Sequence, residues 1–294
     1  MSGLAAWVEG ARLRTLPAAV APVFAGAGVA WWAGGFNLGK ALLCAVVALA
    51  LQIGVNFAND YSDGIRGTDD ERRIGPQRLV GSGAASPRAV KLAAFGCFAL
   101  AGLAGLALTW WTGHWFLLAI GAAAVLAAWF YTGGPKPYGY LGLGEVFVFL
   151  FFGLVAVNGT TFVMLDRISW ASWWASIAIG SFACAILVAN NLRDIAGDRQ
   201  VGKHTLATRL GDRGTRSFFI GLLVIATAGV VAVALASTIW ALFGLIFLPL
   251  LVNPVRSLIG GARGLALIGV LKMTGIAELL CGVGLFFGFV VGAA

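Results

Sequence analysis

Nine apolar stretches, each about 20 residues long, constrain the fold of this chain more than any other feature. A helix needs about 20 apolar residues to cross ~30 Å of hydrocarbon. The stretches lie roughly at 15–34, 40–59, 89–110, 114–132, 141–164, 170–191, 216–236, 238–254 and 273–293. Because 60% of the residues are hydrophobic and only 11% are charged, a soluble domain could not cover this surface. The sequence therefore predicts a single polytopic membrane domain over 1–294, an all-α bundle of nine transmembrane helices.

The basic residues indicate how this bundle is oriented. In the predicted topology, only Lys40 and Arg167 lie in connections on one side, and every other Lys and Arg lies on the opposite side. Cytoplasmic connections carry the excess of Lys and Arg, so we expect a cytoplasmic amino terminus in a bacterial plasma or inner membrane. Nine spans then place the carboxyl terminus outside. The two long connections, about 60–88 and 193–215, are both predicted to be cytoplasmic, and functional residues often collect in such loops.

Two polar motifs occur at the predicted cytoplasmic ends of two spans. Their members at helical spacing are Asn56, Asp60 and Asp63 in the first motif and Asn190, Asp194 and Asp198 in the second. Carboxylates on one helix face repel each other, and a charge at membrane depth costs about 2.5–3.5 kcal/mol. A divalent cation removes both penalties, and Mg²⁺ prefers such oxygen ligands together with substrate phosphates. We therefore expect the two motifs to face each other around Mg²⁺ and a diphosphate.

Basic and aromatic residues near the motifs fit the same chemistry. The cations available to neutralise a diphosphate are Arg66, Arg72, Arg78, Lys136, Arg193, Arg199 and Lys203. Because the site lies where helices leave the bilayer, the diphosphate is expected to carry a lipid tail. A metal-bound allylic prenyl diphosphate would ionise towards a carbocation, which aromatic faces stabilise. Tyr131 and Tyr61, which lie next to the loops, are the best candidates for this shielding.

These residues resemble the UbiA superfamily of intramembrane prenyltransferases over essentially the whole chain. The resemblance is carried by Arg12–Pro17, Asn56–Asp70, Tyr131–Tyr140 with Gly144 and Glu145, Asn190–Asp194 and Lys203–Leu206. It implies a nine-helix bundle that uses Mg²⁺ to transfer a polyprenyl group from polyprenyl diphosphate to an aromatic acceptor. The branch with the closest motifs implies 1,4-dihydroxy-2-naphthoate as the acceptor, with loss of diphosphate and CO2, in menaquinone synthesis.

The resemblance also implies which residues bind the metal, bind the diphosphate and take part in catalysis. The implied metal ligands are Asp60, Asp63, Asp194 and Asp198. Because Gly64 stands where the family motif has its last acid, Asp63 or Asp69 is expected to substitute for it. The expected diphosphate-binding residues are Asn56, Asn59, Arg66, Arg72, Arg78, Asn190, Asn191, Arg193 and Lys203. Tyr131 and Lys136 complete the implied catalytic set, with one more residue between them than the family motif has.

Other activities fit parts of the sequence. Motif spacing alone does not distinguish the naphthoate from 4-hydroxybenzoate as the acceptor. A membrane transporter would account for polar residues such as Glu145 and Glu278 within spans. The acidic motifs, however, cluster at one membrane face, whereas transport sites lie near the midplane. Residues 60–64 match only the opening of a CDP-alcohol phosphotransferase motif.

Nucleic acids are not expected as partners, because the basic residues are explained by membrane topology. Residues 197–204 come close to a phosphate-binding P-loop, but His204 stands where Ser or Thr should bind Mg²⁺. Gly284, Gly288 and Gly292 form a stripe of small residues on the last span. This stripe predicts close helix packing inside the bundle and leaves a homodimer open.

Overall fold

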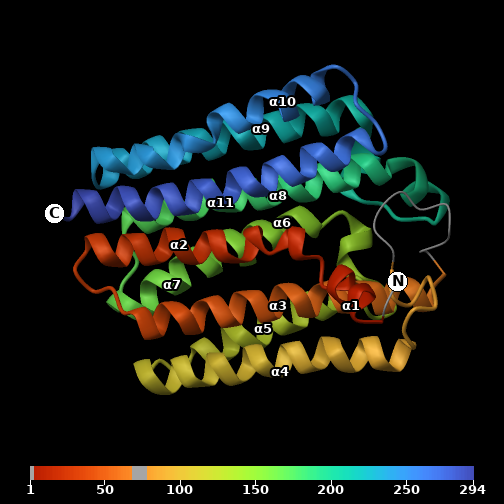
Figure 1. Ribbon diagram of the computed structural model, residues 1–294, viewed down its shortest axis with the longest axis horizontal. Helices are drawn as coiled ribbons and strands as arrows, with labels where there is room; N and C mark the ends of the chain where they lie inside the picture. Colours follow the sequence, from red (N-terminus) through yellow and green to blue (C-terminus); the bar gives the residue numbers. More distant parts are fainter. Residues whose placement is uncertain (1–2, 68–77) are drawn as a thin grey trace.

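The computed structural model describes residues 3–67 and 78–294, and the regular elements in these ranges are all helices. Figure 1 shows the long helices running side by side along one axis. The elements are α1 (Gly3–Gly10), η1 (Leu13–Thr15), α2 (Pro17–Trp32), α3 (Leu38–Ile65), α4 (Pro87–Thr112), α5 (Leu117–Phe130), η2 (Tyr138–Leu141), α6 (Gly144–Val148), η3 (Phe149–Val155), α7 (Ala156–Leu165), α8 (Trp170–Gln200), α9 (Leu206–Ala236), η4 (Ile239–Phe247), α10 (Leu248–Ile259) and α11 (Ala266–Gly292). The all-α prediction is confirmed.

Seven helical segments of the described chain are long and apolar enough to cross a membrane. They are α3, α4, the run α6–η3–α7, α8, α9, the run η4–α10 and α11. The segments Gly3–Thr15 and Pro17–Trp32, bent by 45° to each other, would together make an eighth. The apolar helix α5 has 14 residues, fewer than a full span usually needs. The polytopic membrane bundle is confirmed, and the count of nine spans stays a prediction.

Two of the predicted spans are built from more than one kind of helix. The stretch predicted at 141–164 consists of α6, the π-helical turns of η3, and α7. The stretch predicted at 238–254 begins as the 3₁₀-helix η4 and continues as α10, which extends to Ile259. Pro249 lies in the first turn of α10, where its missing N–H is not needed for the helix. Hydropathy identified these stretches but did not reveal the change of helix type.

Polar caps define where several of the long helices begin. Asn37 precedes α3 and accepts a hydrogen bond from the backbone N–H of Lys40, at 3.0 Å. Ser169 precedes α8, and its side chain and that of Ser172 each accept from the other residue's backbone N–H. Thr205 caps α9 in the same way as Asn37 caps α3. These side chains satisfy N–H groups that a helix start leaves unpaired.

The glycine stripe of α11 packs inside the bundle. A Cβ atom on Gly284 or Gly288 would overlap the backbone carbonyl oxygens of Phe243 and Trp240 in η4. On another face of the same helix, a Cβ on Gly282 would overlap the backbone of Ala21 in α2. Figure 1 accordingly shows α11 running between α2 and the α9–α10 layer. The predicted packing role of the stripe is confirmed.

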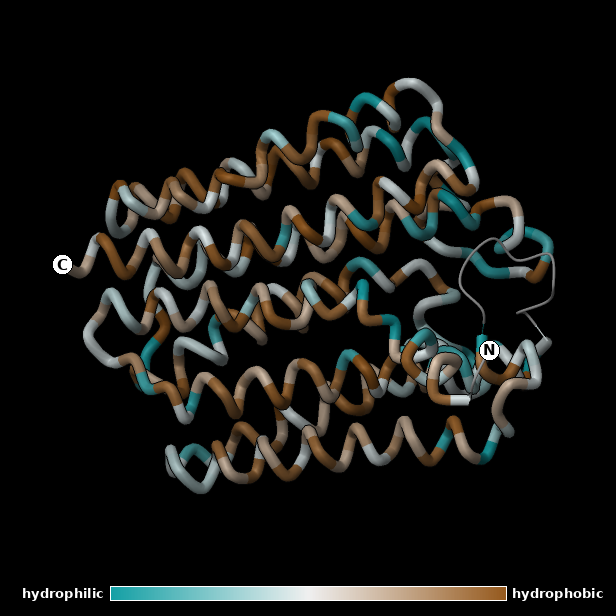
Figure 2. Tube along the Cα trace, viewed as in Figure 1, coloured by the Kyte–Doolittle hydropathy of each residue, from teal (hydrophilic) through white to brown (hydrophobic). Residues whose placement is uncertain are grey.

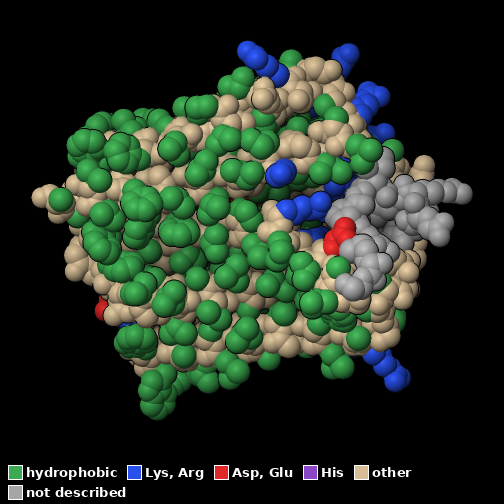
Figure 3. Space-filling model, viewed as in Figure 1, with side chains coloured by type: hydrophobic (Ala, Val, Ile, Leu, Met, Phe, Trp, Pro, Cys, Tyr) green, Lys and Arg blue, Asp and Glu red, His purple; other side chains and the backbone are tan. Residues whose placement is uncertain are grey.

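Polar residues gather mainly at one end of the bundle. Figure 2 shows most hydrophilic segments at the end that holds α1, whereas the lengths of the helices are largely hydrophobic. In Figure 3, apolar side chains cover most of the visible face, and Lys and Arg side chains cluster towards the same end. Such a surface suits a lipid environment with a charged layer at one boundary.

Gly288→Val should destabilise the bundle, because its side chain would push the backbone of η4 away from α11. The expected loss is about 1–3 kcal/mol, the usual cost of overpacking, and it is measured as thermal unfolding in detergent micelles. Gly269→Val is the matched control, since Gly269 lies in the same helix with nothing within 4 Å of its Cβ position. Equal unfolding temperatures for the two variants would contradict the packing assignment.

Candidate active site

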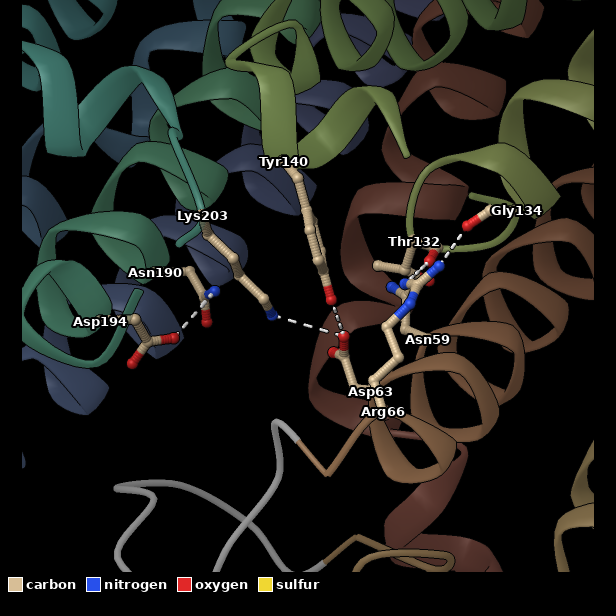
Figure 4. Close-up of polar contacts among 9 residues, drawn as sticks. All are labelled: Asn59, Asp63, Arg66, Thr132, Gly134, Tyr140, Asn190, Asp194 and Lys203. Carbon is tan, nitrogen blue, oxygen red and sulfur yellow. Dashed lines mark hydrogen bonds and ion pairs between the residues drawn. The ribbon is translucent and has the colours of Figure 1, made fainter. Parts of the chain in front are cut away.

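A carboxylate near the carboxyl end of α3, in the first polar motif, joins three separate segments of the chain. Asp63 Oδ1 accepts a hydrogen bond from the Tyr140 hydroxyl at 2.5 Å and lies 3.3 Å from Lys203 Nζ. Tyr140 belongs to η2, and Lys203 lies in the connection between α8 and α9. Figure 4 shows these side chains meeting in a space between the ends of α3 and α8, which we call the polar chamber. The two predicted motifs therefore face one chamber.

The turn after α5 is attached to α3 beside this chamber. The Thr132 hydroxyl donates to Asn59 Oδ1 at 2.8 Å, and the Arg66 guanidinium donates to the backbone carbonyls of Thr132 and Gly134. The same guanidinium lies 5.4 Å from the centre of the Tyr140 ring. Arg66, predicted to bind diphosphate, thus also fixes the turn that carries neighbouring site residues.

The α8 motif forms a compact ion pair on the opposite wall. Arg193 donates hydrogen bonds to both oxygens of Asp194, with Nε–Oδ1 and Nη2–Oδ2 distances of 2.7 and 2.6 Å. Its Nη2 also donates to Asn190 Oδ1 at 2.9 Å, and Asn190 Nδ2 lies 3.5 Å from Asp194 Oδ2. The Arg193 side chain is 2% exposed, whereas that of Asp194 is 21% exposed. Bidentate pairing orients the carboxylate while one side of it still reaches the chamber.

Charges around Lys203 keep it protonated. Burial by itself would lower the pKa of Lys203, but the nearby Asp63, Tyr140 and Asp198 outweigh it and raise the pKa above its ordinary value. The ammonium group lies 4.4 Å from the centre of the Tyr140 ring. Burial, followed by the charge of Asp63, also raises the pKa of Tyr140, so its hydroxyl stays a donor. The chamber therefore offers a fixed positive charge beside a carboxylate.

Asn56 and Asp60 lie on a different face of α3 from Asp63, contrary to the single shared face expected from spacing. Asn56 Nδ2 donates to the Ala11 carbonyl and the Thr15 hydroxyl, each at 3.0 Å. Asp60 is fully buried, and its two oxygens accept the backbone N–H groups of residues 79 and 80 at 2.9 Å each. Asn59 and Asp63, one turn apart, are the pair on the chamber side. The reason is that the amino-terminal segment and the chain after residue 78 pack against the Asn56–Asp60 face.

The remaining predicted residues are distributed unevenly. Lys136 is exposed in the turn after α5 and contacts no described acidic side chain. Arg78 is buried close to the segment that holds Asp60. Asn191 Nδ2 donates to Glu145 Oε1 at 3.0 Å, away from Asp194. Asp69 and Arg72 lie outside the described residues. The predicted metal and diphosphate roles of all these residues stay predictions.

Sequence reasoning missed three contributors to the site. Tyr140 and Thr132 belong to the fourth-loop motif but were given no role, although that motif placed them beside Tyr131. Glu145 was considered as a polar residue that a transporter could use, whereas in the structure it accepts a hydrogen bond from Asn191. Burial raises the pKa of Tyr131, and the negative charges of Glu145, Asp63 and Asp198 add to this effect. Tyr131 therefore lies within electrostatic reach of both motifs.

The oxygen donors of the chamber fit Mg²⁺ only together with a phosphate ligand. Among the described residues, no group of three or more His, Cys, Asp or Glu side chains converges on one point. Mg²⁺ in phosphate-transfer sites typically takes one or two carboxylates and completes its shell with water and phosphate oxygens. Asp63 on α3, and Asp194 and Asp198 on α8, can supply such ligands from opposite walls. Lys203 adds a cation beside these carboxylates, whereas the Arg193 guanidinium is buried against Asp194 and Asn190.

The fold defines a polytopic membrane protein, and the polar chamber is a candidate site for an anionic ligand at one end of its helical bundle. Comparison with known families assigns it more narrowly. The chain matches the UbiA prenyltransferase family over residues 19–263 and belongs to that family.

Curated relatives resemble most of the chain. The 1,4-dihydroxy-2-naphthoate octaprenyltransferase of Mycobacterium tuberculosis is 52% identical over 284 residues, covering 95% of each chain. The Escherichia coli protein of the same name is 39% identical, covering 85% of this chain and 84% of that one.

Solved structures share the fold at low identity. A UbiA homolog from Aeropyrum pernix K1, in its apo form, superposes with a TM-score of 0.72 at 17% identity, covering 92% of this chain and 97% of that one. A homolog from Archaeoglobus fulgidus, bound to DMAPP and Mg²⁺, gives a TM-score of 0.63 at 16% identity, covering 95% and 98%. The family match, the bacterial relatives and the apolar helices together make this chain a multi-pass protein of a bacterial membrane.

Asp60→Asn should weaken the fold, because the amide can accept one of the two backbone N–H groups but turns its own NH₂ towards the other. The expected loss is about 1–3 kcal/mol, the cost of a buried unsatisfied donor. Thermal unfolding measures it, with Asp166→Asn as the control, since the Asp166 side chain is 67% exposed. If Asp60→Asn unfolds at the wild-type temperature, the anchoring role is wrong.

Proposed function

We propose that this protein transfers a polyprenyl group from polyprenyl diphosphate to 1,4-dihydroxy-2-naphthoate, releasing diphosphate and CO2, as a step of menaquinone synthesis. The observation that carries the proposal is similarity over 95% of the chain to a 1,4-dihydroxy-2-naphthoate octaprenyltransferase. The polar chamber supports it, because acids and bases from both motifs meet at the membrane boundary. A lipid diphosphate can bind there with its tail in the bilayer.

The diphosphate is held by both walls of the chamber. Asp63, Asp194 and Asp198 would hold Mg²⁺ jointly with the diphosphate, with Asp60 and Asp69 as further predicted ligands. Lys203 neutralises phosphate oxygens, since it is positively charged and borders the chamber. Arg193, the buried partner of Asp194, is predicted to add to this positive charge. When bound, Mg²⁺ draws electrons towards the leaving diphosphate. The bound Mg²⁺ and DMAPP of the Archaeoglobus fulgidus homolog support this arrangement.

Aromatic side chains lie next to the proposed position of the diphosphate. The hydroxyl of Tyr140 holds Asp63, while its ring packs between the Arg66 and Lys203 cations. Tyr131 packs edge-on against Tyr138 at 5.6 Å between ring centres. These rings exclude water from the reacting carbon of the donor, which protects an allylic carbocation from hydrolysis. The acceptor ring then attacks this carbon.

The membrane arrangement consistent with this reaction has nine spans and a cytoplasmic chamber. The spans are α2, α3, α4, α5, α6–η3–α7, α8, α9, η4–α10 and α11. The clustering of Lys and Arg at the chamber end supports a cytoplasmic amino terminus, and an odd number of crossings places the carboxyl terminus outside. The homodimer that the glycine stripe left open gains no support, because η4 covers Gly284 and Gly288.

Purified protein should form prenylated product from a labelled polyprenyl diphosphate and 1,4-dihydroxy-2-naphthoate only when Mg²⁺ is present. Asp63→Asn and Asp194→Asn should each lower kcat by about 100-fold or more, since each removes a charge from one wall of the chamber. Asp166→Asn, at the other end of the bundle, should keep wild-type activity. Product from 4-hydroxybenzoate alone would overturn the acceptor, and solute uptake into vesicles without diphosphate release would indicate a transporter.

Cysteine labelling tests the orientation. In a background with the four native cysteines replaced by Ala, Arg167→Cys and Ala293→Cys should react with a membrane-impermeant maleimide added to intact cells. Arg199→Cys should react only after the membrane is opened. All three positions are exposed, so their accessibility depends on the side of the membrane and not on burial. Labelling of Arg199→Cys in intact cells would contradict a cytoplasmic chamber.

A further inference from the structure

Glu145 is a buried carboxylate that the diphosphate site does not use. It lies in the first turn of α6 and is 6% exposed. Its Oε1 atom accepts a hydrogen bond from Asn191 Nδ2 at 3.0 Å, and no described basic side chain forms an ion pair with it. The preceding residue, Asn190, instead contacts the Arg193–Asp194 ion pair. Two neighbouring amides of α8 therefore contact two different carboxylates, Asp194 and Glu145. A buried carboxylate without a cation is costly unless it has a hydrogen-bond donor.

Tyr131 lies close to the segment that carries Glu145. A Cβ atom on Gly144, the residue before Glu145, would lie 3.6 Å from the Tyr131 hydroxyl oxygen and 3.3 Å from its ring. Glu145, Asp63 and Asp198 all act electrostatically on this one phenol. Tyr131 therefore lies near Glu145 as well as near carboxylates of the chamber. In the proposed function, a molecule that reacts with the donor next to its diphosphate would lie beside Tyr131.

Other aromatic rings lie next to Tyr131. Tyr138 and Phe147 stack with ring centres 4.1 Å apart and planes inclined by 26°. Phe151 continues the stack beyond Phe147, at 6.3 Å. Tyr138 also packs against Tyr131, at 5.6 Å between ring centres, so the column of flat rings borders the phenol that lies beside Gly144. Flat rings beside one strong hydrogen-bond acceptor suit a planar aromatic ligand that bears a hydroxyl group.

We propose that Glu145 binds a hydroxyl group of the aromatic acceptor, and that Asn191 positions the carboxylate for this contact. The inference rests on the proposed function and adds a subsite to it. The acceptor also carries its own carboxylate, which Glu145 repels. The hydroxyl that faces Glu145 is therefore the one at carbon 4, because the hydroxyl at carbon 1 is directly adjacent to the acceptor carboxylate. Selection of a 1,4-dihydroxy ring over a monohydroxy ring follows from this contact.

The test compares the binding of two ligands that differ only in this hydroxyl. Dissociation constants for 1,4-dihydroxy-2-naphthoate and 1-hydroxy-2-naphthoate are measured by naphthoate fluorescence under anaerobic conditions, with Mg²⁺ and inorganic diphosphate present. Wild-type protein should prefer the dihydroxy ligand about 10- to 100-fold, as expected for a hydrogen bond to a charged group. Glu145→Gln should reduce this preference about tenfold, because a neutral amide oxygen is a weaker acceptor.

Two further variants keep the result interpretable. Glu145→Asp retains the charge and should keep more of the preference than Glu145→Gln. Glu278→Gln is the matched control, because Glu278 is a fully buried carboxyl in α11, and it should keep the full wild-type preference. Each variant's affinity for Mg²⁺ with inorganic diphosphate should stay within about threefold of wild type, which excludes general misfolding.

The possible failures are distinct. If wild-type protein shows no preference between the two ligands, or if Glu145→Gln keeps it in full, the Glu145 subsite is wrong while prenyl transfer still stands. Equal loss of preference in Glu278→Gln also overturns the subsite, because the effect would then come from removing any buried carboxyl. Absence of product from the naphthoate with wild-type protein overturns the proposed function itself.

Discussion

The contact of Asp63 with Tyr140 and Lys203 is the interaction on which the site depends. Its partners lie 77 and 140 residues further along the chain, so one carboxylate draws together the end of α3, the segment before α6 and the connection after α8. The Asp63 side chain is only 7% exposed, and a buried carboxylate requires donors of this kind. The polar chamber exists because these three segments satisfy one another's polar groups.

The arrangement separates two chemical environments along the bundle axis. Near the boundary, carboxylates are paired with Lys203 and Arg193, and the balance of charges suits a metal-bound diphosphate. Beyond Tyr131, Glu145 has an amide partner and aromatic neighbours, which suits a neutral hydroxyl on a flat ring. In the proposed arrangement, donor and acceptor meet different residues of the same helix, α8. Selectivity for the acceptor can change without altering the residues that hold the diphosphate.

Hydropathy and helical spacing predicted much of this molecule. The long apolar stretches appear as helices, and α8 continues through Asn190 and Asp194 to Gln200, as the spacing of its polar residues required. The glycine stripe packs closely, as small residues on a membrane helix usually do. Hydropathy did not reveal the 3₁₀ start of the η4–α10 span or the π-helical turns of η3, because both types of helix bury the same apolar side chains.

The sequence by itself determined that the chain enters a membrane and that two acidic motifs end two of its helices. Only the tertiary structure decided which face of α3 each acid occupies. Residues three and four apart lie within a wide arc of one helix, so spacing alone could not separate Asp60, which binds backbone N–H groups, from Asp63, which faces the chamber. The contact between Glu145 and Asn191 likewise joins residues 46 apart, and packing between helices brings them together.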